Sequence, residues 1–123
     1  MIAAVLDDLA DLVNRDASLV RRGRYLSTTF LVETGPTAWL VTVHEGRVTG
    51  LERGPFLMRA WSFAIRASEE AWRRFWEPMP AAGWHDLFAM TKSGHATVEG
   101  DLRPLMANLR YVKDVLTKPR RSA

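Results

Sequence analysis

The stretch LSTTFLVETGPTAWLVTVHEGRVTGLER, residues 26–53, decides the fold because apolar and polar side chains alternate along most of it. One face of two successive predicted strands is formed by Leu26, Thr28, Phe30, Val32, Trp39, Val41 and Val43. Gly35-Pro36 turns the chain between these strands, and Glu45-Gly46 predicts a tight hairpin to a third strand over residues 47–53. Gly50 upsets the alternation and predicts a bulge there.

Helical periodicity flanks this β-rich stretch on both sides. Apolar spacing predicts helices over residues 2–13, 69–76, 84–91 and 102–116, with Ser68 and Asp101 as N-caps of the second and the last. Residues 14–24 read as a cationic connector, and alternation predicts further strands over residues 60–66 and 95–99. The order predicts an α+β fold: a five-stranded, largely antiparallel sheet covered on one face by about four helices.

Length and composition indicate a single domain. The chain has 123 residues, of which 47% are hydrophobic and 25% charged, as in ordinary soluble globular proteins. We expect one domain over residues 1–117, followed by a basic, disordered tail over residues 118–123. No basic leader precedes Asp7, and no apolar run approaches the roughly 20 residues that cross a bilayer, so we expect a cytoplasmic protein.

Charge and cysteine content exclude several classes of function. The chain has no cysteine, which rules out disulfides, thiol nucleophiles, thiolate zinc sites and iron–sulfur clusters. The net charge of +3 equals the excess supplied by Lys118, Arg120 and Arg121, so we expect no nucleic-acid surface and at most weak contact with a membrane surface.

Residues able to perform catalysis or hold a metal do not form a motif. His44, His85 and His95 lack the spacing of a helical metal site, and no glycine-rich phosphate loop is present. Glu99 and Asp101 flank a glycine, but an N-cap explains Asp101 without any reaction. We therefore expect no catalytic residue, no metal and no cofactor.

The aromatic content is the most informative feature. Five tryptophans and five phenylalanines lie in one small domain, together with five methionines. Large rings ordinarily fill a core, whereas rings on short helices beside adaptable methionines also suit a cavity for a hydrophobic ligand. The residues alone leave both interpretations open.

The stretch SGHATVEGD, residues 93–101, and the apolar stripe after it form a pattern of a glycine, a short strand, a Gly-Asp pair and a long helix. In this pattern the chain resembles the sterol carrier protein type 2 family of small lipid-binding domains, as a bacterial stand-alone member. Residues 39–43, the turn Glu45-Gly46, residues 63–68 and Trp72 follow the family's order and spacing upstream. The resemblance spans roughly residues 25–116, and the segment from Pro78 to Met90 departs from it.

The resemblance implies a non-catalytic carrier with a hydrophobic tunnel between sheet and helices. Fatty acyl chains, sterol-like or quinone-like lipids are the implied ligands, with no cofactor. Carried over by position, the tunnel walls comprise Phe30, Trp39, Val41, Trp61, Phe63, Trp72, Phe75, Trp76, Phe88, Met106 and Leu109. Arg59 or His85 would orient a polar head group at the mouth.

An alternative keeps this fold without a pocket. The aromatic rings then close the interior, and the protein acts as an interaction module that forms a homodimer or docks on a lipid- or quinone-modifying enzyme. Tyr111 supports this alternative, because it lies nearly opposite the Leu105/Leu109 stripe and is expected to be exposed or part of an interface.

Overall fold

A computed structural model describes residues 6–56 and 59–120 of the chain. Its helical segments are the 3-10 helix η1 (Leu6–Asp8) and the α-helices α2 (Leu9–Asn14), α3 (Ala17–Arg22), α4 (Glu69–Phe75), α5 (Leu87–Lys92), α6 (Arg103–Ala107) and α7 (Leu109–Thr117). The strands are β1 (Thr28–Thr34), β2 (Ala38–His44), β3 (Arg47–Arg53), β4 (Phe63–Ala67) and β5 (Ala96–Gly100). The predicted Ile2 and Val5 of the first helix lie outside the described residues.

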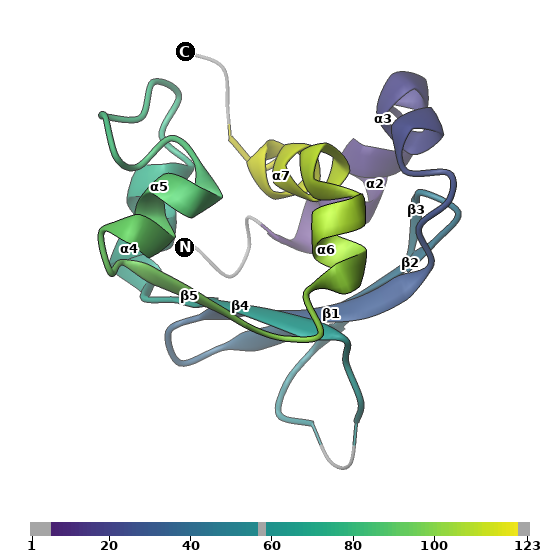
Figure 1. Ribbon diagram of the computed structural model, residues 1–123, viewed down its shortest axis with the longest axis horizontal. Coiled ribbons are helices and arrows are strands. Elements are labelled where there is room, and N and C mark those ends of the chain that lie inside the picture. Colours follow the sequence, from purple (N-terminus) through teal and green to yellow (C-terminus); the bar gives the residue numbers. More distant parts are fainter. Residues whose placement is uncertain (1–5, 57–58, 121–123) are drawn as a thin grey trace.

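The five strands form one sheet in the order β3-β2-β1-β4-β5. Only β1 and β4 pair in parallel, and the other three pairings are antiparallel. The helices cover one face of this sheet, and the connection between β3 and β4 extends on the opposite side (Figure 1). The predicted α+β fold with a largely antiparallel sheet is therefore confirmed, although the described residues contain six α-helices instead of about four.

The predicted turn chemistry is also confirmed. Glu45 and Gly46 have φ angles of 50° and 84°, and His44 pairs with Arg47 across this two-residue turn. Such positive φ angles at both central residues match the right-handed twist of a hairpin. The register between β2 and β3 shifts between Thr42 and Val43, so that Thr42 pairs with Gly50. The bulge therefore lies where Gly50 interrupts the alternation.

Two helical segments differ from the prediction. The expected connector contains α3, because the Asp16 side chain caps it by accepting a hydrogen bond from the Leu19 N–H at 3.1 Å, and Leu19 is buried. The expected single C-terminal helix is divided into α6 and α7 at Asn108, whose side-chain amide donates to the Pro104 carbonyl at 3.1 Å. A side-chain bond of this kind competes with regular helix geometry. Asp101 accepts a bond from the Arg103 N–H, but the N-cap position itself is Leu102.

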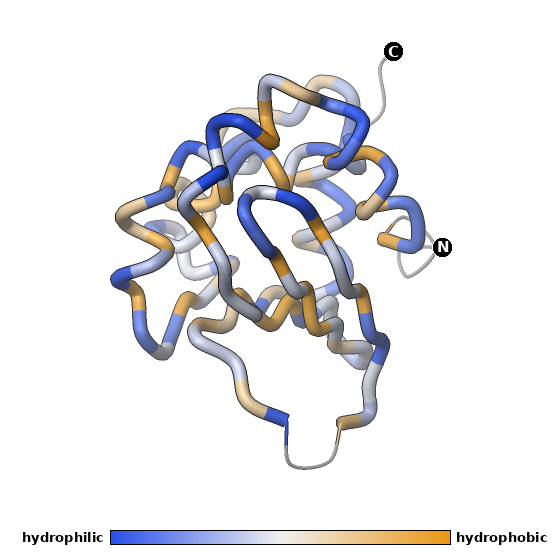
Figure 2. The backbone as a smooth tube through the Cα atoms, turned by 90° about the vertical axis from the view of Figure 1, so that its right-hand side faces the viewer, coloured by the Kyte–Doolittle hydropathy of each residue, from blue (hydrophilic) through white to orange (hydrophobic). Residues whose placement is uncertain are grey.

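The hydrophobic core lies between the helices and the sheet. One large cluster of buried apolar residues joins β1, β2, β4 and β5 to α2, α3, α4, α5, α6 and α7, and a small cluster of Leu31, Leu40 and Ala64 lies on the other face. Hydrophobic and hydrophilic residues alternate along the chain (Figure 2). Within the described residues, no helix has the length and apolar character needed to cross a membrane.

Tyr111 corrects one expectation. It is neither exposed nor free for an interface: it is 1% exposed, and its hydroxyl donates to the Gly46 carbonyl at 2.7 Å. Its ring occupies the space left by Gly23, where an added Cβ would lie 2.4 Å from ring atoms. Tyr111 thus joins α7 to the β2–β3 hairpin, and burial raises its pKa to about 12.

Two residues of the C-terminal segment make specific contacts with the rest of the chain. Lys118 pairs with Asp16 at 2.6 Å, and the Arg120 guanidinium donates to the Phe75 carbonyl at 2.7 Å. Both residues belong to the segment expected as a basic tail, and each contacts an acceptor on an earlier part of the chain. Residues 121–123 lie outside the described residues.

We predict that Tyr111→Phe lowers the free energy of unfolding by about 1 kcal/mol at pH 7, because the buried Gly46 carbonyl loses its donor. The ordinary pKa of 10.0 rises to about 12 in the fold, so the stability contributed by the neutral hydroxyl is present below pH 10 and is lost between about pH 10 and 12. Urea unfolding from pH 8 to 12 measures both effects. Tyr25→Phe is the matched control, since Tyr25 is 84% exposed, and an alkaline decline that Tyr111→Phe leaves unchanged would contradict the assignment.

Candidate ligand-binding site

Adjacent strands place the predicted wall residues of the sheet on the face beneath the helices. Phe30 on β1, Trp39 and Val41 on β2, and Phe63 on β4 all belong to the large core cluster. Phe30 and Phe63 stack with their ring centroids 5.0 Å apart and their planes 5° from parallel. Phe30 and Phe63 are far apart in the sequence, and the parallel pairing of β1 with β4 brings them together.

Helix α4 supplies the opposite wall. The Ser68 hydroxyl caps this helix by accepting a hydrogen bond from the Ala71 N–H at 3.1 Å, as the sequence predicts. The caps and apolar spacing direct Trp72, Phe75 and Trp76 into the same cluster. Trp72 stacks on Trp76 at 4.9 Å and meets Phe75 edge to face at 5.5 Å.

Two of these indoles are anchored to backbone carbonyls. The Trp72 Nε1–H donates to the Glu33 carbonyl at 2.8 Å, which joins α4 to β1. The Trp76 Nε1–H donates to the Leu116 carbonyl at 2.7 Å, which joins α4 to α7. These bonds satisfy buried donors and set the distance of α4 from the sheet and from the C-terminal helix.

The interior is closed in this structure. Phe30, Val41, Phe63 and Trp72 each have an exposed fraction of 0%, so no space large enough for a water molecule adjoins them. Trp39, Phe75 and Trp76 are 3%, 1% and 6% exposed. The structure therefore brings seven of the eleven predicted wall residues together, and their rings fill the space that they enclose.

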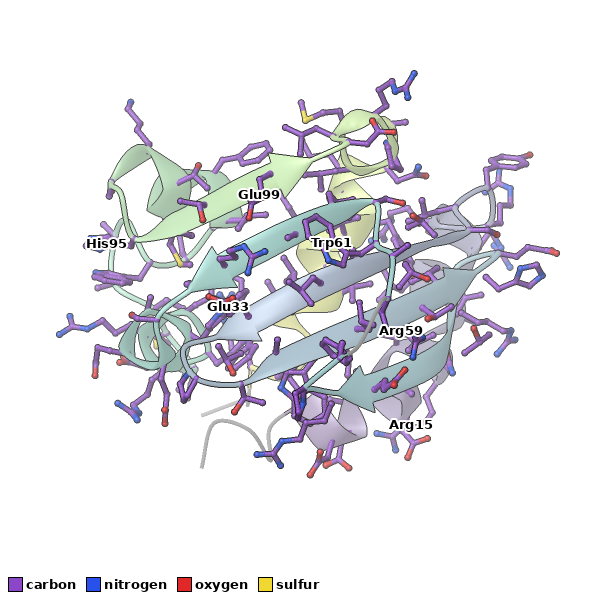
Figure 3. All side chains as sticks on the ribbon, turned by 90° about the horizontal axis from the view of Figure 1, so that it is seen from below. Arg15, Glu33, Arg59, Trp61, His95 and Glu99 are labelled. Atoms are coloured by element: carbon purple, nitrogen blue, oxygen red, sulfur yellow. The ribbon has the colours of Figure 1, made fainter. Side chains whose placement is uncertain are left out.

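The other four predicted residues lie outside this closed group. Phe88 and Leu109 are partly buried against the core from α5 and α7, and Met106 on α6 is 56% exposed. Trp61 lies on the face of the sheet that the helices do not cover, where it packs against the Leu31, Leu40 and Ala64 cluster (Figure 3).

The position of Trp61 has a local cause. Alternation places it on the same face as Phe63, but β4 begins only at Phe63, so the strand rule does not extend to Trp61. The Ser62 N–H donates to the Thr29 carbonyl at 2.8 Å, and the Ser62 carbonyl accepts from the Asp101 N–H at 2.7 Å.

A charged pair on α5 and α7 lies next to the partly buried Phe88. The Lys113 ammonium lies 3.0 Å from an Asp86 carboxylate oxygen and 4.7 Å from the centre of the Phe88 ring. Asp86 also caps α5 by accepting hydrogen bonds from the Phe88 and Ala89 N–H groups. Burial raises the pKa of Asp86, but the hydrogen bond and charge of Lys113 and the backbone donors outweigh it, so the pKa is lower than the ordinary value.

The two polar residues expected at a mouth, Arg59 and His85, lie apart from the Lys113–Asp86 pair. Arg59 pairs with Glu52 and lies on the uncovered side of the sheet (Figure 3), and the His85 carbonyl accepts a bond from Arg120. Sequence reasoning missed Lys113, although its position four residues after Leu109 places it on the same side of the helix.

The segment from Pro78 to Met90, which departs from the family pattern, contains a stacked tryptophan. Trp84 lies 4.1 Å from the His95 ring centre, and the Arg74 guanidinium lies 5.0 Å from the Trp84 ring centre. The predicted helix over residues 84–91 begins at Leu87 instead, because Asp86 caps it.

A hollow of about 820 Å³ lies elsewhere, between α2, α3 and the end of α7. Its lining comprises Leu12, Arg15, Asp16, Ala17, Leu19, Arg22, Asp114, Thr117, Lys118 and Arg120, none of which is a predicted wall residue. Its carboxylates are paired, Asp16 with Lys118 and Asp114 with Arg22. Over residues 6–56 and 59–120, no three histidine, aspartate or glutamate side chains gather as metal ligands.

Comparison with known proteins gives matches in structure only. No family model matches the sequence, and no curated protein matches it. A crystal structure of sterol carrier protein 2 superimposes with a TM-score of 0.77 over 98% of this chain and 96% of that chain, at 13% identity. A conserved hypothetical protein of Thermus thermophilus matches with a TM-score of 0.66 over 98% of this chain and 88% of its own, also at 13% identity. A ubiquinone synthesis protein, UbiJ-SCP2, matches with a TM-score of 0.60 over 94% of each chain at 17% identity.

We predict that Asp86→Asn costs about 0.5 kcal/mol at pH 7, because it removes the ion pair but keeps an oxygen for the cap. Asp86→Ala costs about 1 kcal/mol more, because the cap is also lost. Since the folded pKa lies below the ordinary 3.8, this stability is present above pH 3.8 and is lost as the pH falls through the folded pKa. Urea unfolding at pH 2 to 7 measures it, and a wild-type to Asp86→Asn difference that does not shrink in acid would contradict the ion pair.

The comparisons and the sheet–helix arrangement agree over nearly the whole chain, and the chain therefore has the fold of sterol carrier protein 2.

Proposed function

We propose that this protein is a non-catalytic carrier for a hydrophobic small molecule, a fatty acyl, sterol-like or quinone-like lipid, held between the sheet and the helices. The single observation that supports this most is the match to sterol carrier protein 2, which covers 98% of this chain. The apolar, ring-lined layer between the two walls is consistent with it, because burial of each ligand CH₂ there contributes about 0.8 kcal/mol. Fold alone does not determine function, so the proposal needs a direct test.

A ligand must separate side chains that are now in contact, and the side of the molecule bounded by α5 and α6 offers the least resistance. Phe88 and Leu109 are only partly buried there, and Leu102 and Met106 are 38% and 56% exposed. The Lys113 contacts with Asp86 and Phe88 hold α5 to α7 beside them. Trp76 donates to the Leu116 carbonyl and Arg120 donates to the Phe75 carbonyl, and these two bonds hold α4 to α7 and to the C-terminal segment. We therefore propose that the ligand enters between α5 and α6.

Catalysis is not part of the proposal. Ser27, His44 and Glu45 form a hydroxyl–imidazole–carboxylate chain, with Ser27 Oγ 3.5 Å from His44 Nδ1 and Glu45 3.1 Å from His44 Nε2. The His44 and Glu45 side chains are 66% and 68% exposed, and the Ser27 hydroxyl accepts the Glu45 N–H. A working triad needs a shielded carboxylate that orients the imidazole, which this exposed surface group does not provide.

We predict that the purified protein contains lipid in near-stoichiometric amount. Mass spectrometry of an organic extract measures it, against the extract of an unrelated protein from the same host. An empty extract, with no response of the tryptophan fluorescence to added fatty acid, sterol or quinone, would overturn the carrier proposal.

The entrance has its own prediction. Met106→Glu should weaken binding of a pyrene-labelled alkyl ester on the order of fivefold, because a charge replaces an apolar contact at the entrance. The matched control is Met79→Glu, which adds the same charge at a residue that is 84% exposed outside α5 and α6. Fluorescence titration compares the two variants, and equal effects would place the entrance elsewhere.

A second candidate function is an interaction module without a cavity, either a homodimer or a partner of a lipid- or quinone-modifying enzyme. The closed interior favours it, because the rings of Phe30, Phe63 and Trp72 already fill the space. The similarity to UbiJ-SCP2, named a ubiquinone synthesis protein, is compatible with this role. Sedimentation velocity over a hundredfold range of concentration tests self-association, and a constant monomer would exclude the homodimer.

A further inference from the structure

One buried donor in the sheet wall differs from its neighbours. Trp72 and Trp76 donate their indole N–H groups to carbonyls at 2.8 and 2.7 Å. Trp39 is 3% exposed, and among the described residues its Nε1 is buried with no hydrogen-bond partner. Buried side-chain donors are almost always paired, so an unpaired one calls for an explanation.

The ring of Trp39 is firmly placed. On β2 it pairs with Val32 of β1 on one side and with Arg53 of β3 on the other, and the Arg53 guanidinium lies 5.6 Å from the ring centre. The neighbouring strand residue Glu33 is the one whose carbonyl accepts the Trp72 N–H. Trp39 thus belongs to the same wall, and to the same core cluster, as the rings that would border a ligand.

Burying the unpaired Trp39 N–H costs free energy that another side chain at this position would not cost. Phenylalanine fills most of the same apolar volume without an N–H group, so the indole is an unfavourable choice if the site is only packing. If a ligand brings an acceptor atom, the Trp39 N–H forms a hydrogen bond with it and is no longer buried without a partner. Arg53, whose guanidinium lies over the Trp39 ring, is exposed to water, and no lysine or arginine of the described residues is buried, so no buried cation is present to neutralise a carboxylate beside the indole.

We propose that the ligand of this protein carries a neutral oxygen acceptor, as in a quinone carbonyl, an ester or a sterol hydroxyl, and that this oxygen accepts the Trp39 indole N–H. This inference rests on the proposed carrier function and narrows it to oxygenated, uncharged lipids. Trp39 then favours ligands that carry such an oxygen and fixes how far they lie between the sheet and the helices, while apolar contact supplies most of the binding free energy.

The test compares Trp39→Phe with the wild type, using 2-heptadecanone and heptadecane supplied from cyclodextrin. The two probes have chains of equal length, and only the ketone carries an acceptor. We expect Trp39→Phe to weaken ketone binding about fivefold, because one neutral hydrogen bond is lost, and to leave heptadecane binding unchanged within about twofold. In the unliganded protein, Trp39→Phe loses core packing but no hydrogen bond, so its urea midpoint should fall less than that of Trp72→Phe.

Trp72→Phe is the matched control, since its N–H is paired within the protein. It should lower the urea midpoint and should not discriminate between the two probes. Equal weakening of ketone and heptadecane by Trp39→Phe would overturn the acceptor inference and leave the carrier function intact. A midpoint lowered as much as in Trp72→Phe would show that the Trp39 N–H is paired within the chain, which also overturns it. Failure of the wild type to bind either probe would overturn the carrier function itself.

Discussion

The parallel pairing of β1 with β4 is the contact on which the rest of the structure depends. Leu31 to Thr34 pair with Ala64 to Ala67, and this ladder joins the β1–β2–β3 meander to the β4–β5 pair. It brings Phe30 against Phe63 and places β1 beneath α4, where Trp72 reaches the Glu33 carbonyl. Its strands are far apart in sequence, so closing this contact has a substantial entropic cost that the buried rings must offset.

The same rings that stabilise the fold close the space between its two layers. In the proposed carrier function, a ligand would exchange ring–ring contacts for ring–ligand contacts, so only the difference between the two would be available for binding. Moving side chains apart to admit a ligand costs least where they are only partly buried. Beside α5 and α6, Phe88 and Leu109 are partly buried and Met106 is exposed. Bonds from Trp76 and Arg120 hold α4 to α7 and to the C-terminal segment.

The similarity to sterol carrier protein 2 at 13% identity illustrates what such a fold requires. Apolar residues at alternate strand positions and at helical spacing are sufficient to specify the two layers, and many different side chains satisfy this pattern. The polar groups of this chain that border the layer include the unpaired indole of Trp39 and the partly exposed Lys113–Asp86 pair, and the proposed ligand would meet them.

The sequence by itself determined the strands, the Glu45-Gly46 turn, the bulge beside Gly50, the Ser68 cap and the apolar faces of the strands and of α4, because each depends on local periodicity or on a backbone preference of a few neighbouring residues. Tertiary structure alone decided that Trp61 lies on the uncovered face, that Tyr111 is buried against Gly23, and which indole N–H groups find a carbonyl. These outcomes depend on which distant segments meet. A period along the chain reports which side of an element is apolar, whereas the partner that covers that side is chosen by the packing of the whole molecule.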